Sequence, residues 1–153
     1  MKKYLVTTAV AAMALALAAC DSRMVYDRYA HTPTSGWEKN DTLSFGVPPV
    51  DAAAYAATLG LRTTGDYPFT ALTLVVEQRV YPGGEVYTDT LHCQLTDRRG
   101  NAATRGVSYH QYEFPVRTVA LQQGDSIHVR IRHDMKREIL PGVSDVGFSL
   151  RRE

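Results

Sequence analysis

The chain is poor in cysteine and has no marked excess of charge of either sign. Only Cys20 and Cys93 occur in its 153 residues. If Cys20 is modified, Cys93 has no partner for an internal disulfide, even in an oxidising compartment. The 17 basic and 16 acidic side chains nearly cancel, so the strongly basic face that nucleic acid requires is not expected. We therefore expect neither an internal disulfide nor a nucleic-acid partner.

Motifs for nucleophilic catalysis and for metal binding are also missing. The sequence has no Gly-x-Ser-x-Gly elbow, the turn that exposes the nucleophile of many hydrolases. Zinc needs three or four converging ligands, and His128 and His133 lie five residues apart, so on one regular strand they point to opposite faces. We expect no catalytic residue, no metal and no cofactor. A carboxylate pair for glycoside hydrolysis stays open, because the distance between the two carboxylates is a three-dimensional quantity.

What the sequence does contain is an export signal at its start. Lys2 and Lys3 precede a short apolar run from Leu5 to Leu17, which is typical of a signal peptide. The run is too short to span a bilayer comfortably, since this takes roughly 20 apolar residues. It ends in Leu17-Ala18-Ala19-Cys20, which resembles the lipobox at which bacterial lipoproteins are acylated and cut. We predict a signal peptide over residues 1–19 and lipid attachment at Cys20.

The predicted mature chain, residues 20–153, divides into a tether and one domain. Removing Lys2 and Lys3 leaves 15 basic against 16 acidic side chains, a net charge of −1. Residues 20–36 are polar, without a sustained period, and are predicted to be the lipidated N-terminus and a tether. Residues 37–153 alternate with period 2 between turn residues, which indicates short strands. We place them at 42–47, 55–63, 69–81, 85–96, 107–116, 118–121, 126–133 and 146–151.

This pattern predicts an all-β fold, a single antiparallel β-sandwich of jelly-roll type. Alternation in the strand at 126–133 places Ile127, Val129 and Ile131 in the core, and puts a basic stripe on its outer side. Cys93 lies between two leucines of the same face, Leu91 and Leu95. We therefore expect Cys93 to be a small buried hydrophobe and favour this over a nucleophile.

Two segments are candidate binding sites. Tyr109 and Tyr112 lie on opposite faces of one predicted strand, so an aromatic ring is expected at the surface, where it could stack on a sugar. Tyrosine is also simply common in strands.

The connection before the last strand is dense in charge, and is either a solvated loop or a docking loop for a partner. Its candidate contacts are His133, Asp134, Met135, Lys136, Arg137 and Asp145.

Several stretches together resemble the GldH family of gliding-motility lipoproteins. They are Val25-Tyr26-Asp27, Trp37, Leu61-Arg62, Tyr67-Pro68-Phe69 before Leu72-Thr73-Leu74, Asp89 to Leu95 with Asp97 and Gly100 behind, and Met135 to Gly147. The resemblance covers nearly the whole mature chain. It implies a lipoprotein of the cell envelope that is linked to gliding and to the associated secretion machinery, and that is not an enzyme.

The sequence therefore predicts a lipid-anchored envelope protein on a bacterial membrane, either facing the periplasm or in the outer membrane. We expect a non-catalytic component or accessory of an envelope assembly of the gliding-motility or secretion type, with protein partners. The alternative is a lipoprotein that binds carbohydrate or another ligand on the same fold.

Overall fold

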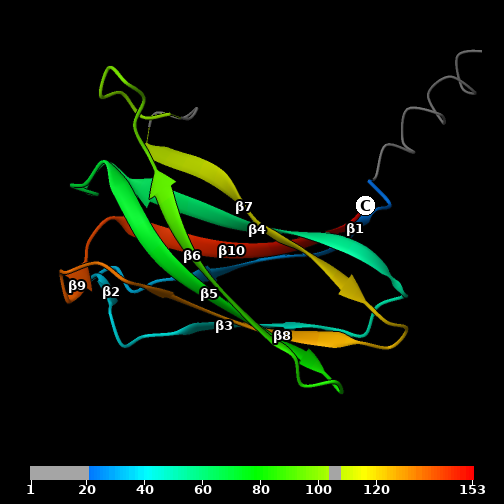
Figure 1. The fold of residues 1–153 in the computed structure, drawn as a ribbon. Coiled ribbons are helices and arrows are strands. Elements are labelled where there is room, and N and C mark those ends of the chain that lie inside the picture. Colours follow the sequence, from blue (N-terminus) through cyan, green and yellow to red (C-terminus); the bar gives the residue numbers. More distant parts are fainter. Residues whose placement is uncertain (1–20, 104–107) are drawn as a thin grey trace, which may run out of the picture.

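The computed structural model describes residues 21–103 and 108–153 and consists of strands joined by turns (Figure 1). Their bounds are β1 (Met24–His31), β2 (Trp37–Glu38), β3 (Leu43–Val47), β4 (Ala53–Thr64), β5 (Ala71–Tyr81), β6 (Val86–Gln94), β7 (Tyr109–Leu121), β8 (Ser126–His133), β9 (Ile139–Leu140) and β10 (Val143–Arg152). A strand occurs wherever the period-2 pattern predicts one, and the all-β prediction is confirmed.

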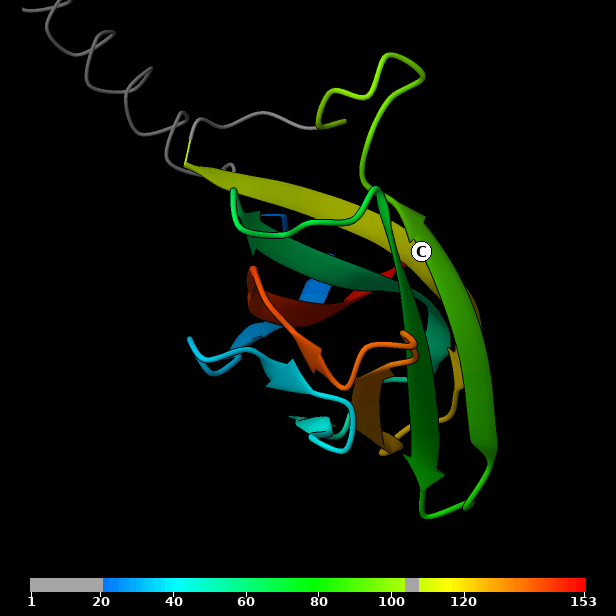
Figure 2. The same ribbon diagram turned by 90° about the vertical axis from the view of Figure 1, so that its left-hand side faces the viewer.

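The eight long strands form two four-stranded antiparallel sheets that pack face to face (Figure 2). One sheet has the order β1-β10-β4-β7 and the other has the order β3-β8-β5-β6, while β2 and β9 make a small ribbon. Among the long strands the first pairs with the last, the second with the seventh, the third with the sixth and the fourth with the fifth. This nested pairing is the winding of a jelly roll.

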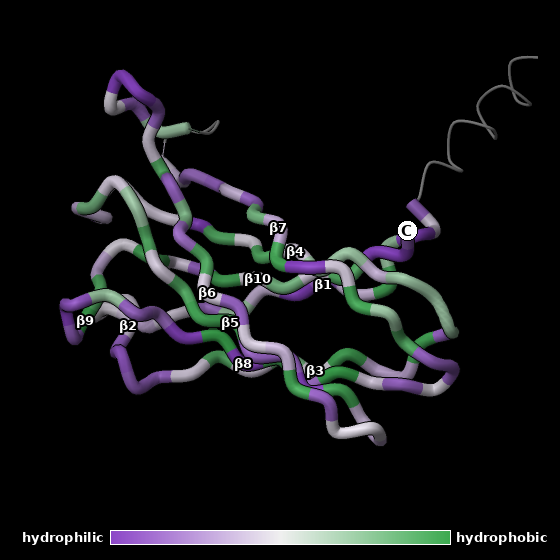
Figure 3. The backbone as a smooth tube through the Cα atoms, in the orientation of Figure 1, coloured by the Kyte–Doolittle hydropathy of each residue, from purple (hydrophilic) through white to green (hydrophobic). Residues whose placement is uncertain are grey.

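The core lies between the two sheets and consists of buried apolar side chains from both. Hydrophobic and hydrophilic residues alternate along the strands (Figure 3). Ile127, Val129 and Ile131 are all buried, as predicted, and the basic residues between them are exposed. Cys93 is fully buried, and burial raises the pKa of its thiol to about 12. A thiol with such a pKa is not a nucleophile near neutral pH.

The predicted tether, residues 20–36, is wrong for residues 24–31. Residues 24–31 form β1, which pairs along its length with β10. All eight side chains of β1 are at least partly exposed, because the strand lies at the edge of its sheet. An edge strand is held by its main-chain ladder, so it need not show the hydrophobic alternation by which strands are recognised.

The predicted strands at 107–116 and 118–121 are one strand, β7. Pro115 interrupts the pattern but not the strand, because β7 is at an edge and proline is tolerated where no partner needs its N–H. Ala57 pairs with Arg117 and Thr58 with Pro115, so Val116 is the extra residue of a β-bulge. Arg117 then reaches the other sheet, where its Nε and Nη2 donate to the carboxylate of Asp89 at 2.7 and 2.8 Å.

Candidate functional site

A groove runs along the outer face of the sheet β1-β10-β4-β7. It comprises two hollows of about 780 Å³ and 370 Å³, and both are lined by Arg62 and Gln111. Sites for small ligands commonly have a few hundred cubic ångströms. We call this feature the outer-face groove. Its walls come from all four strands of the sheet, so strand pairing fixes the positions of its side chains.

Tyr29, Gly60 and Gly147 build the floor of the groove. The registers Tyr29↔Gly147 and Gly147↔Gly60 put these three residues in one row across the sheet. A Cβ atom at Gly60 would lie 2.3 Å from the Tyr29 hydroxyl, and one at Gly147 would lie 2.7 Å from Cε1 of the ring. The tyrosine ring therefore lies over the two glycines and fits only because neither has a side chain.

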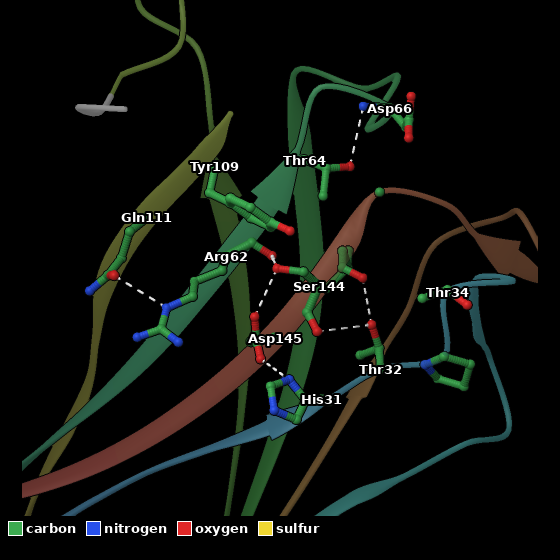
Figure 4. A pocket seen from close by; sticks show the side chains of 13 residues that line it. His31, Thr32, Thr34, Arg62, Thr64, Asp66, Tyr109, Gln111, Ser144 and Asp145 are labelled. Atoms are coloured by element: carbon green, nitrogen blue, oxygen red, sulfur yellow. Dashed lines mark hydrogen bonds and ion pairs between the residues drawn. The ribbon is translucent and has the colours of Figure 1, made fainter. Parts of the chain in front are cut away.

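The guanidinium of Arg62 stacks on this ring, with its Cζ 3.9 Å from the Tyr29 ring centroid. Its Nε donates a hydrogen bond to Oε1 of Gln111 at 3.2 Å (Figure 4). Burial raises the pKa of Tyr29, and the positive charge of Arg62 opposes that rise. Cation–π stacking and the hydrogen bond both hold Arg62 in place.

The next row of the sheet holds an acid and an imidazole. His31 of β1 pairs with Asp145 of β10, and Nδ1 of His31 contacts Oδ1 of Asp145. The Asp145 side chain is 9% exposed, whereas that of His31 is 89% exposed. The Ser144 hydroxyl donates to Oδ2 of the same carboxylate at 2.8 Å (Figure 4). A nearly buried carboxylate is thus covered by an imidazole that solvent can reach.

The two predicted tyrosines have different surroundings. Tyr109 is 60% exposed and lines the larger hollow, on the same side as Asp145. Tyr112 is 8% exposed, and its hydroxyl donates to the carbonyl of Leu95 at 3.1 Å. The prediction that Tyr112 forms part of an aromatic surface is therefore wrong. Alternation along β7 turns it inward, where its ring packs against that of Phe114.

The predicted docking loop is only partly a loop. His133, the last residue of β8, is fully buried beside Trp37, with ring centroids 5.1 Å apart. Its Nε2 lies 3.1 Å from the Trp37 carbonyl, and its Nδ1 accepts from the Met135 amide at 3.4 Å. Burial lowers the pKa of His133. This histidine is a part of the core and not a surface contact, which corrects the prediction.

The rest of that segment divides between two surfaces. Lys136 and Arg137 are exposed between β8 and β9, beside the exposed Asp134. Met135 is half-buried, and its sulfur accepts from the Thr73 amide at 3.4 Å. Asp145 lies in β10 and faces the groove. The structure thus separates Asp145 from the charged segment and places it in one hollow with Tyr109.

Sequence reasoning missed Tyr29, His31 and Gln111 as site residues. Tyr29 and His31 lie in the segment predicted as a tether, and Gln111 lies in a strand selected only for its aromatics. The sequence did contain one signal for this site. Gly60 and Gly147 lie inside strands, and glycines in such positions often mark the close approach of another group.

The remaining sequence predictions concern the signal peptide, lipid attachment and metal binding. Cys20 and the signal peptide 1–19 lie outside the described residues. Within residues 21–103 and 108–153, no group of three or more metal-ligating side chains comes together. No helix in this part is long and apolar enough to cross a membrane.

Solved structures with a similar chain path are distant. A family GH115 4-O-methyl-alpha-glucuronidase is 13% identical with a TM-score of 0.47, and the match covers 88% of this chain but only 18% of that enzyme. The cellulose-specific carbohydrate-binding module CBM28 is 9% identical with a TM-score of 0.48, over 83% of this chain and 74% of the module. The globular domain of a zebrafish complement 1qA protein is 10% identical with a TM-score of 0.44, over 86% and 100%. Likenesses at this level carry no argument about function.

The described chain belongs to the class of jelly-roll β-sandwiches with a polar groove on one sheet. No curated protein sequence matches it. The model of the GldH lipoprotein family matches residues 24–150, from the first strand to the last, and the chain belongs to this family. It is therefore a lipoprotein of the gliding-motility type, held by lipid at the cell envelope.

Proposed function

We propose that this lipoprotein is a non-catalytic component of an envelope assembly of the gliding-motility or secretion type, and that the segment between β8 and β9 docks a protein partner. The observation that carries the proposal is the contrast between exposed and buried side chains within this segment. Lys136 and Arg137 are exposed and Ile139 is 48% exposed, between the fully buried His133 and Leu140. A charged and partly apolar surface held on buried anchors is suited to binding, because loops on rigid scaffolds commonly carry it.

The position of the segment supports this role. Only three residues, 21–23, separate Cys20, the proposed anchor, from Met24, where β1 begins. The C-terminus lies beside the first described residues, and the Arg152 amide donates to the Arg23 carbonyl at 2.8 Å. The ribbon β2-β9 lies at the opposite end of the sandwich (Figure 1). In this arrangement the anchored end stays near the bilayer and the docking segment projects away from it.

Crosslinking in intact envelopes, followed by recovery of the lipoprotein, tests the proposal. The test variant carries Lys136→Glu and Arg137→Glu. The control carries Arg98→Glu and Arg99→Glu in the exposed turn after β6, which reverses the same charges elsewhere. Both pairs should change the free energy of unfolding by only about 0.5 kcal/mol per site. We expect the test variant to lose its crosslinked partners and the control to keep them. Equal recovery by the two variants would refute the docking role.

A ligand-binding role on the same fold is the second candidate. The outer-face groove is the observation that favours it, because its polar side chains are held in fixed positions by one another. This role and partner docking use different surfaces of the molecule, so the protein can have both.

A further inference from the structure

We propose that the outer-face groove binds a neutral oligosaccharide chain, with Tyr109 as a stacking surface and with Arg62, Gln111 and Glu113 as hydrogen-bonding groups. The inference rests on the ligand-binding role given above as the second candidate. It is independent of the docking segment, which lies between β8 and β9.

The shape of the groove suits a chain rather than a single small group. The larger hollow lies by the row that contains His31 and Asp145, and the smaller one extends past Gly60 and Gly147 to Met24 and Arg151. The residues from 24 to 31 of β1 follow the same course. At about 3.3 Å per strand residue this is roughly 23 Å. A ligand that fills both hollows has to be elongated.

The flat floor is a built feature and not an accident of surface shape. Gly60 and Gly147 are buried although they lie on the outer face of the sheet, because the Tyr29 ring covers them. Arg62 is stacked on this ring and bonded to Gln111, so its planar guanidinium is held before a ligand arrives. A group ordered in advance loses less conformational entropy on binding.

The polar groups around the floor match the chemistry of neighbouring hydroxyl groups. A guanidinium offers paired donors, and a carboxylate offers paired acceptors in one plane. Arg62 of β4 and the exposed Glu113 of the adjacent strand β7 both line the smaller hollow, so the groove offers donors and acceptors side by side. A sugar hydroxyl both donates and accepts, and it can therefore use both kinds of group. Tyr109 adds an exposed ring with an apolar face and a polar tip.

The charges in the groove favour a neutral ligand. Carboxylates of Asp27, Glu113 and Asp145 lie near Tyr29 together with the guanidinium of Arg62. Arg151 lines the smaller hollow, but its Nη2 is paired with Asp21 at 2.8 Å. A polyanionic ligand would be repelled by these carboxylates, because the groove has too few cationic side chains to compensate their negative charge. The same groove has Arg62 at its centre, which disfavours a polycationic peptide.

Titration calorimetry on the full-length lipoprotein tests this assignment. The protein is kept in a detergent without a sugar head group, and the probes are neutral hexaoses of the cello, manno, xylo and chito series. We expect at least one series to bind, with a Kd that does not change between low and high salt. Tyr109→Ala and Arg62→Met should each weaken that binding about tenfold, the order expected for the loss of one well-placed contact.

Arg130→Met is the matched control, because Arg130 is a half-exposed strand arginine on the outer face of the other sheet. It should leave the Kd unchanged, as should the double charge reversal of Lys136 and Arg137. The assignment is overturned if no hexaose binds at millimolar concentration, or if Arg130→Met weakens binding as much as Arg62→Met. It is also overturned if high salt abolishes the binding of the neutral hexaoses. Loss of crosslinked partners with hexaose binding intact, or the reverse, separates failure of this site from failure of the docking segment.

Discussion

Replacing Gly60 by alanine should dislodge Tyr29 without disturbing the core. The new Cβ would lie 2.3 Å from the Tyr29 hydroxyl and 2.7 Å from Cζ of its ring, and both distances are far inside van der Waals contact. The obstacle is the end of a half-buried side chain and not backbone, so the ring can move outward. Gly60 has no positive φ, and alanine can therefore adopt its backbone conformation without strain.

The size of the effect follows from what the ring loses. Its stacking with Arg62 at 3.9 Å is worth about 0.5–1 kcal/mol at a partly exposed site. Contact of one ring face with the two glycines adds about 1 kcal/mol, for on the order of 40 Å² of apolar area. Against this loss, an alanine restricts the unfolded chain and stabilises by about 0.4–1 kcal/mol. The single substitution should therefore destabilise the fold by about 0.5–1.5 kcal/mol.

A double-mutant cycle isolates the contact from these other contributions. Denaturant unfolding is measured for the unaltered protein, Gly60→Ala, Tyr29→Ala and the double variant. With Tyr29 removed, Gly60→Ala should change sign and stabilise by about 0.4–1 kcal/mol, giving a coupling energy of about 1–2 kcal/mol. Gly46→Ala is the matched control, because Gly46 also lies inside a strand but a Cβ there would meet nothing within 4 Å. It should show no coupling with Tyr29→Ala. Additive free energies for Gly60 and Tyr29 would refute the stacked floor of the groove.

Three further outcomes are expected. Cys20→Ser should abolish incorporation of a fatty-acid analogue in metabolic labelling while the domain still folds, and persistent label on the variant would exclude lipidation at Cys20. Cys93 should resist alkylation in the folded protein, because burial raises the pKa of its thiol to about 12, and Cys93→Ala should cost about 1–2 kcal/mol. His133 has a lowered pKa in the folded state, since burial disfavours its charged form. The unfolded chain thus binds the proton more readily, and the stability that is present above pH 6.5 should fall as the pH drops below that value. His133→Gln should flatten this slope in thermal unfolding between pH 7 and 5, whereas His128→Gln at an exposed position should not.

Much of the fold could be predicted from the sequence because its causes are local. Alternation of apolar and polar side chains places strands and their inner faces, as it does for Ile127, Val129 and Ile131. Turn chemistry is also local. Gly84 adopts a positive φ in the β5–β6 hairpin, and the Asp97 carboxylate accepts from the amides of Arg99 and Asn101. Cys93 is buried for the same periodic reason as its neighbours.

The groove could not be predicted in this way, because its residues meet only through pairing between distant strands. Tyr109 and Asp145 were selected as members of two separate sites, and β7 and β10 bring them into one hollow by pairing with opposite sides of β4. Tyr109 and Tyr112 were both candidates for an aromatic surface, and only the packed structure decided that Tyr112 faces the core and Tyr109 the solvent.

The sequence by itself predicted an export signal and determined the all-β class and the inner face of most strands, since each depends on the order of neighbouring residues. The tertiary structure decided that residues 24–31 are a strand, because β1 is defined by its ladder with β10 and not by a pattern of its own. The tertiary structure also decided the outer-face groove, because the groove depends on the pairing of distant strands. Tyr29 reaches Gly60 and Gly147 only when the first and last strands of the chain pair, and the register of that pairing is set by the packing of the whole sandwich.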